Sequence, residues 1–538
     1  MARIFNTTGP CNPADHYMIP AETRLPEVWP LIAHKEYFVL HAPRQVGKTT
    51  TMMALAEVLR AQGVAACWAT LERSQGFEEV ERAEPLWIDA LVRWGKRGMP
   101  AEYHPPDAAA VGHVSPGSRL NEFLCLWAAK IPVPFVLLLD EADVVKGPAL
   151  VSLLRQLRDG HMGRGIGYFP VSVGLIGMRD LRDYLVEAKG GRPINPGSPF
   201  NVKAESLTMR GFTAAEVGEL VGQHTAETGQ VFAAEAVELL VELTAGQPFL
   251  VNALARMCTM RLVPDPSVPI TRDTVEQARE LLILSRTTHL DSLAERLKEP
   301  RVAAIVQAVL TGDSPLRVDT DDFDYTVDLG LIRREPGGAV VANPLYREVL
   351  ARQLSLNLQC NLPAPWWPWA RADGGLDLDA LLAAFRQWWR ENSDVLGEQT
   401  QGYPEAVPHL ALCAFLQRVV NGGGRIHREY AAGRGAMDLL VEYAPMVSGS
   451  KGEGEAAGKR GPIERFAIEI KRVRSRDSLE TVIERGVAQL GRYLDTVGLE
   501  RGWLVVFDVR PDRSWEERLW TREMVVPATG KRVLVLGA

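Results

Sequence analysis

Cysteine is scarce in this sequence, and the cysteines that occur are not paired. Six cysteines are scattered over 538 residues, and none of them forms a C-x-x-C motif. Isolated cysteines of this kind are typical of proteins in a reducing compartment. The spacing also argues against a zinc site built on paired thiolates.

Long apolar runs and an excess of positive charge are also missing. The strongest apolar run, residues 135–139, is far shorter than the about 20 residues that cross a bilayer. The first ten residues, MARIFNTTGP, lack the apolar stretch of a signal peptide. The net charge of −7 excludes a basic coat, so any nucleic-acid contact must come from local patches. We expect a cytoplasmic protein of three or four domains that does not act on membranes.

The clearest pattern that is present is a strand, a loop and a helix between residues 37 and 62. Residues 37–40 predict a buried strand, and residues 49–62 predict a helix that Gly63 is placed to end. The loop between them reads A-P-R-Q-V-G-K-T. A strand, a tight loop ending in Gly-Lys-Thr and a helix together predict a phosphate-binding loop.

This loop has the chemistry needed to hold the phosphates of ATP. Backbone N–H groups at a helix N-terminus face an anion, and the helix dipole favours negative charge there. Gly47 allows close approach, Lys48 can reach the β- and γ-phosphates, and the Thr49 hydroxyl can hold Mg²⁺. Ala42 replaces the first glycine of the usual pattern. The predicted nucleotide-binding residues are Ala42, Pro43, Arg44, Gln45, Val46, Gly47, Lys48, Thr49 and Thr50.

Two later strands are predicted to bring polar residues to the same site. The segment 133–144, VPFVLLLDEADV, reads as a central parallel strand that ends in two carboxylates. Asp140 would hold Mg²⁺, and Glu141 would polarise the attacking water. A further strand within residues 168–180 ends near Arg179, our candidate for sensing the γ-phosphate, with Ser172 a weaker one. The alternative is that Arg179 only caps a strand at the surface.

The middle of the chain predicts mainly helices. Residues 81–117 contain several Pro and Gly and predict irregular structure. Residues 213–244 predict two amphipathic helices, and a Gly-Gln-Pro turn at 246–248 would bring the following helix back toward the nucleotide. Residues 302–354 combine a helical pair with two short strands across a Gly-Gly turn, a winged-helix pattern. Arg333 and Arg334 there would contact phosphates, or the domain would serve only as a packing module.

The C-terminal part contains a second group of candidate catalytic residues. Asp438 lies near the start of a predicted strand. Glu469 and Lys471 are two residues apart on another strand, so they project from one face. Two carboxylates can bind Mg²⁺ or Mn²⁺, which activates a water for phosphodiester hydrolysis, while Lys471 orients that water or neutralises charge. Glu405, at the start of a helix over 404–420, is a further candidate metal ligand.

Further C-terminal residues support this interpretation. Gln489 and Tyr493 lie four apart on one face of a helix, and residues 503–508 predict the strand that closes the sheet. A local patch of arginines and lysine suggests phosphate binding, although a solvated charged face would look the same. The patch comprises Arg425, Arg428, Arg434, Lys471, Arg472, Arg474 and Arg476.

These motifs resemble those of two known families. Residues 38–354 resemble AAA+-type ATPases of the origin-recognition and signal-transduction (STAND) branch, through APRQVGKT, LLLDEAD, the strand tip GMR and the turn GQP. Residues from about 376 to 538 are similar to the PD-(D/E)XK nuclease superfamily, through Asp438, Glu469-x-Lys471 and Gln489-x-x-x-Tyr493. The resemblance implies an α/β multidomain protein with a P-loop parallel-sheet core and a restriction-endonuclease-like domain.

The implied domains are an ATPase core over 1–205, a helical lid over 206–285, a winged helix over 286–358, a Pro/Trp linker over 359–375 and a nuclease-like domain over 376–538. The implied function is an ATP-driven switch that gates a Mg²⁺-dependent DNA nuclease, with a role in defence against foreign DNA or in mobile-element biology. DNA, further copies of this chain and a protein trigger are the expected partners. The alternatives are a nuclease fold that only binds DNA or a partner, and a winged-helix regulator.

Overall fold

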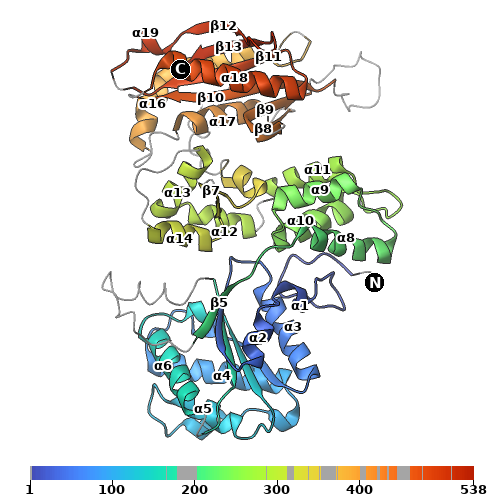
Figure 1. Ribbon diagram of the computed structural model, residues 1–538, viewed down its shortest axis with the longest axis vertical. Coiled ribbons are helices and arrows are strands. Elements are labelled where there is room, and N and C mark those ends of the chain that lie inside the picture. Colours follow the sequence, from blue (N-terminus) through green and yellow to red (C-terminus); the bar gives the residue numbers. More distant parts are fainter. Residues whose placement is uncertain are drawn as a thin grey trace, which may run out of the picture. The chain divides into compact units, whose positions relative to one another are not determined.

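The chain forms two compact units, which we describe separately. Unit 1 comprises Met1–Leu293 and Arg317–Tyr346, and unit 2 comprises Ala294–Leu316 and Arg347–Ala538. The computed structural model (Figure 1) describes residues 3–164, 167–178, 203–285, 288–311, 320–336, 338–350, 352, 371, 373–399, 407–420, 424–432, 435–444, 461–474, 477–510 and 512–538.

Unit 1 is built on a five-stranded sheet in which every neighbouring pair of strands is parallel. The strand order is β2-β3-β4-β1-β5. Because the strands are parallel, their carboxyl ends share one edge, and β1 lies inside the sheet rather than at its border. The strands are β1 (Tyr37–His41), β2 (Ala65–Thr70), β3 (Phe135–Asp140), β4 (Ser172–Gly177) and β5 (Lys203–Thr208).

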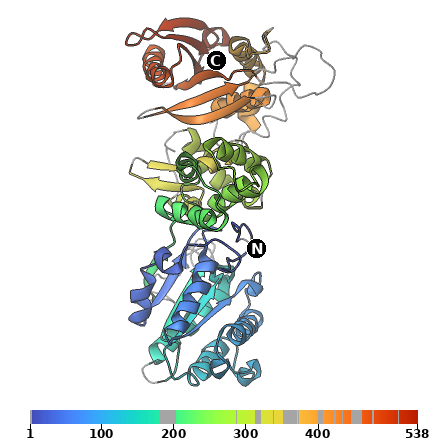
Figure 2. The same cartoon turned by 90° about the vertical axis from the view of Figure 1, so that its right-hand side faces the viewer.

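Helices cover both faces of this sheet, as Figures 1 and 2 show. On one face Met52 and Leu55 pack with strand residues such as Phe38. On the other face Trp87 and Phe123 pack against residues such as Val39. Apolar side chains from both faces of every central strand are therefore buried, as a parallel sheet requires. The first face carries α1 (Ala21–Arg24), α2 (Val28–Ala33) and α3 (Lys48–Ala61), and the second carries α4 (Val80–Gly98), α5 (Arg119–Ala128) and α6 (Gly147–Gly163).

The prediction of irregular structure over residues 81–117 was wrong in its first half. Helix α4 runs through Val80–Gly98 although Pro85 lies inside it. Pro85 removes one backbone hydrogen bond, but Trp87, Ile88 and Leu91 are buried in the core. Burial of these large apolar side chains offsets the local cost, because most helical stability comes from tertiary packing.

A group of helices follows the sheet in unit 1. The Thr213 side chain accepts a hydrogen bond from the Glu216 backbone N–H, and the Glu216 side chain accepts one from the Thr213 backbone N–H. Helix α8 therefore begins with a capping box. Gly229, with φ of +82°, ends it. The helices are α8 (Ala214–Thr228), α9 (Ala234–Thr244), α10 (Pro248–Met257) with a π-helical turn at Cys258–Leu262, and α11 (Arg272–Leu284). Helix α12 (Thr288–Arg296) begins in unit 1 and ends in unit 2.

The residues predicted as a winged helix are divided between the two units. Helix α13 (Pro300–Thr311) belongs to unit 2, whereas α14 (Thr320–Asp328), β6 (Ile332–Glu335) and β7 (Gly338–Val341) belong to unit 1. Strands β6 and β7 form an antiparallel hairpin. Arg333 pairs with Glu335 and Arg334 pairs with Asp324. Most of the predicted linker, residues 359–370 and 372 of 359–375, lies outside the described residues.

Unit 2 contains a six-stranded mixed sheet in the order β12-β13-β11-β10-β9-β8. Strands β8, β9 and β10 form an antiparallel meander, and β11 pairs parallel with both β10 and β13. Residues 503–508 were predicted to form the last strand of the sheet. They lie in the interior strand β11 instead, because β13 and β12 extend the sheet beyond it. The strands are β8 (Gly424–Ala432), β9 (Gly435–Tyr443), β10 (Glu464–Val473), β11 (Arg501–Asp508), β12 (Thr521–Val525) and β13 (Arg532–Gly537).

The two faces of this sheet carry different helices. Helices α16 (Leu378–Gln399) and α17 (Val407–Val420) pack on one face through residues such as Phe385 and Leu416. Helix α18 (Leu479–Val497) lies across the other face, as Figure 1 shows, and a short α19 (Trp515–Arg518) follows β11. None of the helices in the described part of the chain is long and apolar enough to cross a membrane.

Candidate functional site

The P-loop follows β1 at the carboxyl edge of the unit 1 sheet and leads directly into α3. Gln45 and Gly47 adopt positive φ values of +58° and +97°. Such values turn the chain sharply, and glycine tolerates them best. Ala42 is buried at the start of the loop, and its N–H donates to the Gly177 carbonyl at the end of β4. The loop is therefore anchored to two neighbouring strands.

The Lys48 side chain lies inside the loop. Its Nζ donates to the carbonyl oxygens of Ala42 and Pro43 at 2.6 and 2.9 Å. Burial lowers the pKa of Lys48, while the nearby carboxylates Glu141, Asp143 and Asp140 oppose that shift. Lys48 is thus a cation held between the loop backbone and the acidic end of β3.

Thr49 and Asp140 meet across the edge of the sheet. The Thr49 hydroxyl donates to Asp140 Oδ2 at 2.7 Å, although the two residues are 91 positions apart. The Trp68 indole donates to the same oxygen at 3.3 Å, and the Glu141 N–H donates to Oδ1 at 2.9 Å. A hydroxyl beside a buried carboxylate is the oxygen donor set that Mg²⁺ prefers, so these residues fit that ion.

Glu141 follows Asp140 in a strained conformation. Its φ of +54° is uncommon for a residue with a side chain. Burial, together with the charges of Asp143 and Asp140, raises the pKa of Glu141 to about 6. A carboxylate whose pKa approaches neutrality is suited to accept a proton from water.

The tip of β4 is tied to the segment that follows β3. The Met178 N–H donates to Asp143 Oδ2 at 2.9 Å. Arg179, the predicted phosphate sensor, follows Met178 but lies outside the described residues. Ser172 begins β4 at its amino end, where its hydroxyl donates to the Glu36 carbonyl at 2.6 Å. It therefore lies at the edge of the sheet opposite the P-loop, which argues against a sensing role.

Other segments of unit 1 contact the P-loop from outside the sheet. Gln247 Nε2 donates to the Gln45 carbonyl at 3.4 Å, so the predicted Gly-Gln-Pro turn reaches the loop. Thr50 accepts a hydrogen bond from the Cys11 N–H at 3.0 Å. A Cβ on Gly330 would lie 2.6 Å from that of Pro43, which shows a close approach of the turn after α14. Burial lowers the pKa of His289, and the exposed Arg44 is close enough for its charge to add to that shift.

The candidate metal site of unit 2 lies between β9 and β10. The backbone N–H of Ile470 donates to Asp438 Oδ2 at 2.7 Å, and the Asp438 N–H approaches Glu469 Oε2 at 3.5 Å. Lys471 Nζ donates to Glu469 Oε1 at 2.6 Å. The three residues predicted from two separate strands thus converge at one place.

Glu469 is the most deeply buried member of this group, with 0% of its surface exposed. Burial and the charge of Asp438 raise its pKa to about 7, although Lys471 opposes the shift. Two carboxylates at close range resist ionising together unless a cation compensates them. A divalent metal would supply that compensation, so the pair fits Mg²⁺ or Mn²⁺.

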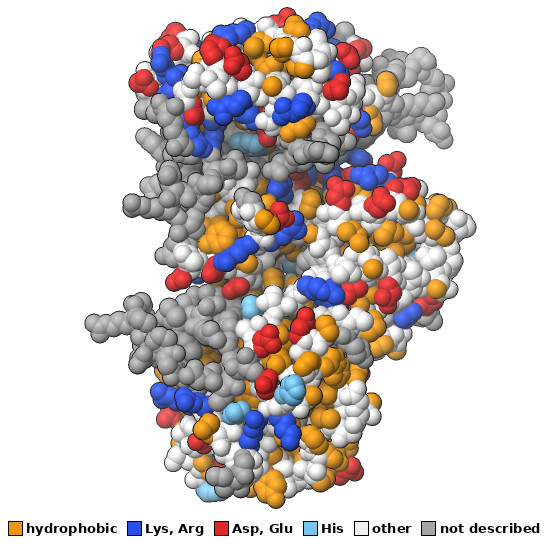
Figure 3. Space-filling model, in the orientation of Figure 1, with side chains coloured by type: hydrophobic (Ala, Val, Ile, Leu, Met, Phe, Trp, Pro, Cys, Tyr) orange, Lys and Arg blue, Asp and Glu red, His pale blue; other side chains and the backbone are white. Residues whose placement is uncertain are grey.

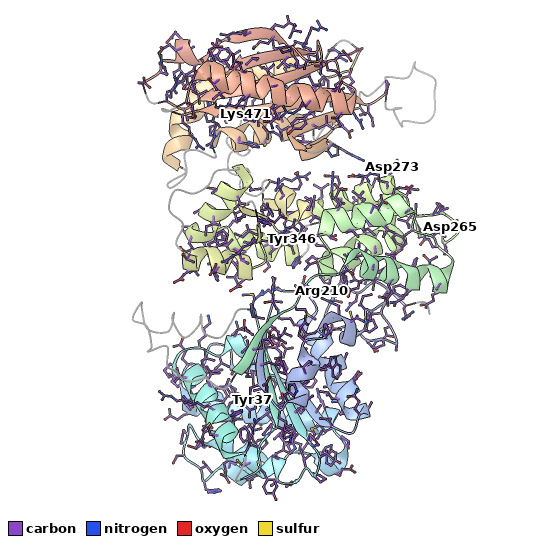
Figure 4. The ribbon with its side chains drawn as sticks, in the orientation of Figure 1. Tyr37, Arg210, Asp265, Asp273, Tyr346 and Lys471 are labelled. Carbon is purple, nitrogen blue, oxygen red and sulfur yellow. The ribbon has the colours of Figure 1, made fainter. Side chains whose placement is uncertain are left out.

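Helix α18 covers this site. A Cβ on Gly486 would lie 3.2 Å from Lys471 Cγ and 2.9 Å from Leu504, so only glycine permits this close approach. Gln489 Nε2 donates to the Tyr493 hydroxyl at 3.2 Å one turn further on. Lys471 lies beneath this helix in Figure 4. The helix therefore brings the Gln489–Tyr493 pair to the face of the sheet that carries Lys471.

The remaining predicted residues of unit 2 are only partly described. Glu405, Arg434 and Arg476 lie outside the described residues. A cluster that the sequence analysis did not identify occurs on β8–β10. Glu442 accepts hydrogen bonds from His427 at 3.0 Å and Arg465 at 2.9 Å. On the face drawn in Figure 3, the described basic and acidic side chains are interspersed.

Together the P-loop, the strand order and the Asp140–Glu141 pair define unit 1 as a P-loop ATPase-like parallel-sheet core. No protein-family model and no curated protein matches the sequence. Solved structures do match it. A Walker-type ATPase of Pyrococcus abyssi is 14% identical, covers 64% of this chain and 99% of its own, and has a TM-score of 0.46.

Two further solved structures show the same range of similarity. The RuvB Holliday junction branch migration motor of Thermotoga maritima is 14% identical, covers 61% of this chain and 93% of its own, and has a TM-score of 0.33. Cdc6p from Pyrobaculum aerophilum is 13% identical, covers 66% of this chain and 97% of its own, and has a TM-score of 0.34.

Proposed function

We propose that this protein is an ATP-binding and ATP-hydrolysing switch that gates a metal-dependent DNA nuclease. The observation that carries the first half is the 2.7 Å hydrogen bond between Thr49 and Asp140. It joins the end of the P-loop to the acidic end of β3, where Thr49 and Asp140 would hold a Mg²⁺ ion that neutralises phosphate charge. Loop residues 42–50 would hold the nucleotide, and Arg179 would sense its γ-phosphate.

Within the ATPase site each side chain has a distinct role. Lys48 would move its ammonium from the loop carbonyls to the phosphate oxygens, a charge-assisted contact. Glu141, with its raised pKa, would accept a proton from the attacking water. Asp143 would hold the tip of β4 in place through the Met178 N–H.

The second half of the proposal rests on the contact of Lys471 with Glu469 opposite Asp438. Asp438 and Glu469 would hold Mg²⁺ or Mn²⁺, with Glu405 as a further ligand, and the metal would supply an activated water and a Lewis acid. Lys471 would orient that water or neutralise charge on the phosphate. Gln489 and Tyr493 would support the same face from α18.

The remaining parts of the chain receive roles consistent with this function. The helices of residues 206–285 would act as a lid, and the winged-helix residues 286–358 as a packing module, since Arg333 and Arg334 pair with acidic neighbours. Arg425, Arg472 and Arg474 would bind DNA phosphates near the metal site. ATP binding would set the assembly of further copies of this chain. By the resemblance to ATPase–nuclease fusions, the protein would act in defence against foreign DNA or in mobile-element biology.

The test is to incubate the purified full-length chain with linear and circular DNA, with and without ATP and Mg²⁺. We expect cleavage that needs the metal and changes with ATP. An Asp438→Ala variant serves as the control for contaminating nuclease. ATP turnover without any cleavage of DNA or RNA would instead indicate a binding module with an inactive nuclease fold. Absence of both activities would remove the proposal.

A further inference from the structure

A buried arginine lies directly behind the P-loop. Arg24 is only 5% exposed. Its Nη2 donates to the Val46 carbonyl of the P-loop at 3.2 Å and to the Arg210 carbonyl at 2.7 Å. Its guanidinium lies over the Phe212 ring, 4.6 Å from the centroid. Figure 4 labels Arg210, which lies between the end of β5 and the start of α8.

The charge of Arg24 is not matched by a carboxylate at hydrogen-bonding distance among the described residues. Both acceptors of its hydrogen bonds are carbonyl oxygens, and its buried Nε has no partner there. The charge of Glu216 acts to raise the pKa of Arg24, but the Glu216 carboxylate forms an ion pair with Arg210 at 2.6 Å. Burial lowers the pKa of Arg24 to about 10. A buried cation of this kind destabilises the folded chain unless an anion compensates it.

The position of Arg24 indicates which anion compensates it. The Val46 carbonyl and the Gly47 N–H are the two ends of one peptide group. A cationic donor on the carbonyl polarises that peptide and strengthens its N–H as a donor. P-loop N–H groups at a helix N-terminus bind phosphate oxygens. A Cβ on Gly47 would lie 3.6 Å from Arg24 Nη1, so the guanidinium lies against the turn that enters α3.

We propose that Arg24 is a positioning residue of the nucleotide site, a buried cation compensated by the polyphosphate bound on the other side of the Val46–Gly47 peptide. This inference rests on the proposed ATP binding. Its consequence is that Arg24 strengthens polyphosphate binding without stabilising the nucleotide-free chain. The effect grows with the charge of the ligand, so it is larger for ATP than for ADP.

The test compares the wild type with Arg24→Met, which keeps the length of the side chain but removes its charge. Calorimetric titration with ATP and ADP, and thermal unfolding with and without ATP, are the measurements. We expect ATP affinity to fall about tenfold, the equivalent of roughly 1.4 kcal/mol, and ADP affinity to fall less. The melting temperature of the nucleotide-free variant should not fall. Removing the unpaired buried charge stabilises the fold, and this gain offsets the loss of two hydrogen bonds.

Arg164→Met is the matched control. Arg164 also donates to two carbonyls, those of Lys35 at 2.6 Å and Val171 at 2.8 Å, but these residues lie at the amino edge of the sheet. Its loss should leave ATP affinity unchanged. Arg24→Lys, which retains a charge, should bind ATP more tightly than Arg24→Met.

Several results would overturn the inference. One is an Arg24→Met variant that binds ATP as tightly as the wild type. Another is a nucleotide-free Arg24→Met protein that melts several degrees lower or does not fold, since that would indicate a purely structural role. If the wild type binds ATP, Lys48→Ala does not, and Arg24→Met still does, only the role of Arg24 is refuted. Wild-type protein that binds no ATP would refute the proposed function as well.

Discussion

The two candidate sites place a lysine and buried carboxylates together in opposite ways. In unit 1, Lys48 is bound by backbone carbonyls and the loop around it is a continuous stretch of chain. In unit 2, Lys471 is bound by the carboxylate of Glu469, and its neighbours come from separate strands. The first site is formed mainly by backbone groups and suits a polyanion. The second is formed by acidic side chains and suits a cation.

The acidic residues of the two sites show a shared principle. Burial raises the pKa of Glu141 to about 6 and that of Glu469 to about 7. In both cases a neighbouring carboxylate contributes to this rise in pKa, and a lysine opposes it. Perturbed pKa values of this kind are enriched where proteins do chemistry. The comparison suggests two independent sites, and variants in one site should separate them.

The largest effect is expected from Asp438→Ala, which removes half of the carboxylate pair. DNA cleavage should disappear while ATP turnover stays within about twofold, because Asp438 takes no part in the P-loop site. Lys471→Ala should also abolish cleavage but spare DNA affinity, since Lys471 acts on charge that develops during attack. Cleavage and ATP hydrolysis, measured on the same preparations, are the readouts.

Glu480→Ala provides the control for Asp438→Ala. Glu480 is an exposed carboxylate of unit 2 that pairs with Arg522, away from the Asp438–Glu469 pair. Its loss changes the net charge equally and should leave cleavage intact. A variant lacking both Asp438 and Glu469 that still cuts DNA would show that the catalytic site lies elsewhere.

Lys48→Ala should have the converse effect. Loss of its charge-assisted contacts should weaken ATP binding at least about a hundredfold, the equivalent of roughly 3 kcal/mol. Binding of Mn²⁺ to unit 2 should be unchanged, because its ligands are other residues. Titration with ATP and with Mn²⁺ tests both halves of this prediction. Equal ATP affinity in variant and wild type would contradict the assigned role of Lys48.

A smaller effect is expected from Glu141→Gln, which keeps the shape of the side chain but removes the base. ATP should still bind within about threefold of the wild type, while kcat falls roughly 10²- to 10⁴-fold. Glu79→Gln is the control, because Glu79 is exposed and forms an ion pair with the neighbouring Arg82. An unchanged turnover rate in Glu141→Gln would rule out Glu141 as the base.

The two sites also differ in how far the sequence predicts them. The P-loop could be located because its residues are contiguous and its flanking strand and helix have clear patterns. The same holds for the apolar run that ends in Asp140. The partners of these residues could not be predicted. Trp68 reaches Asp140 only because β2 and β3 pair in a register that sets Thr70 opposite Asp140.

The unit 2 site shows the same limit more strongly. Alternation along the strand predicts that Glu469 and Lys471 share a face. It does not predict which residue of β9 lies opposite Glu469, because that depends on the register of two strands separated by a long insert. Ile468 pairs with Leu439, which brings the next residue, Glu469, level with Asp438. The role of Gly486 in the approach of α18 depends in turn on that packing.

The smallest predicted effect concerns acid stability in unit 2. The hydrogen bond from His427 and the charges of His427 and Arg465 lower the pKa of Glu442 to about 2. A carboxylate whose folded pKa lies below its unfolded value, near 4.5, stabilises the fold above that value. This stabilisation should be lost as the pH falls from about 4.5 toward 2. Its size is on the order of 2 kcal/mol. This is less than the pKa shift alone implies, because Arg465 is half exposed and solvent screens its charge.

Glu442→Gln isolates this contribution from the other groups that titrate in acid. The urea midpoint of the variant should lie below that of the wild type at pH 6, and the difference should shrink as the pH approaches 2.5. The two curves converge because protonated Glu442 carries no charge for Arg465 to stabilise. A difference that stayed constant over this range would mean that Glu442 acts by packing rather than by charge. DNA cleavage at neutral pH should change little, since Glu442 lies outside the Asp438–Glu469–Lys471 cluster.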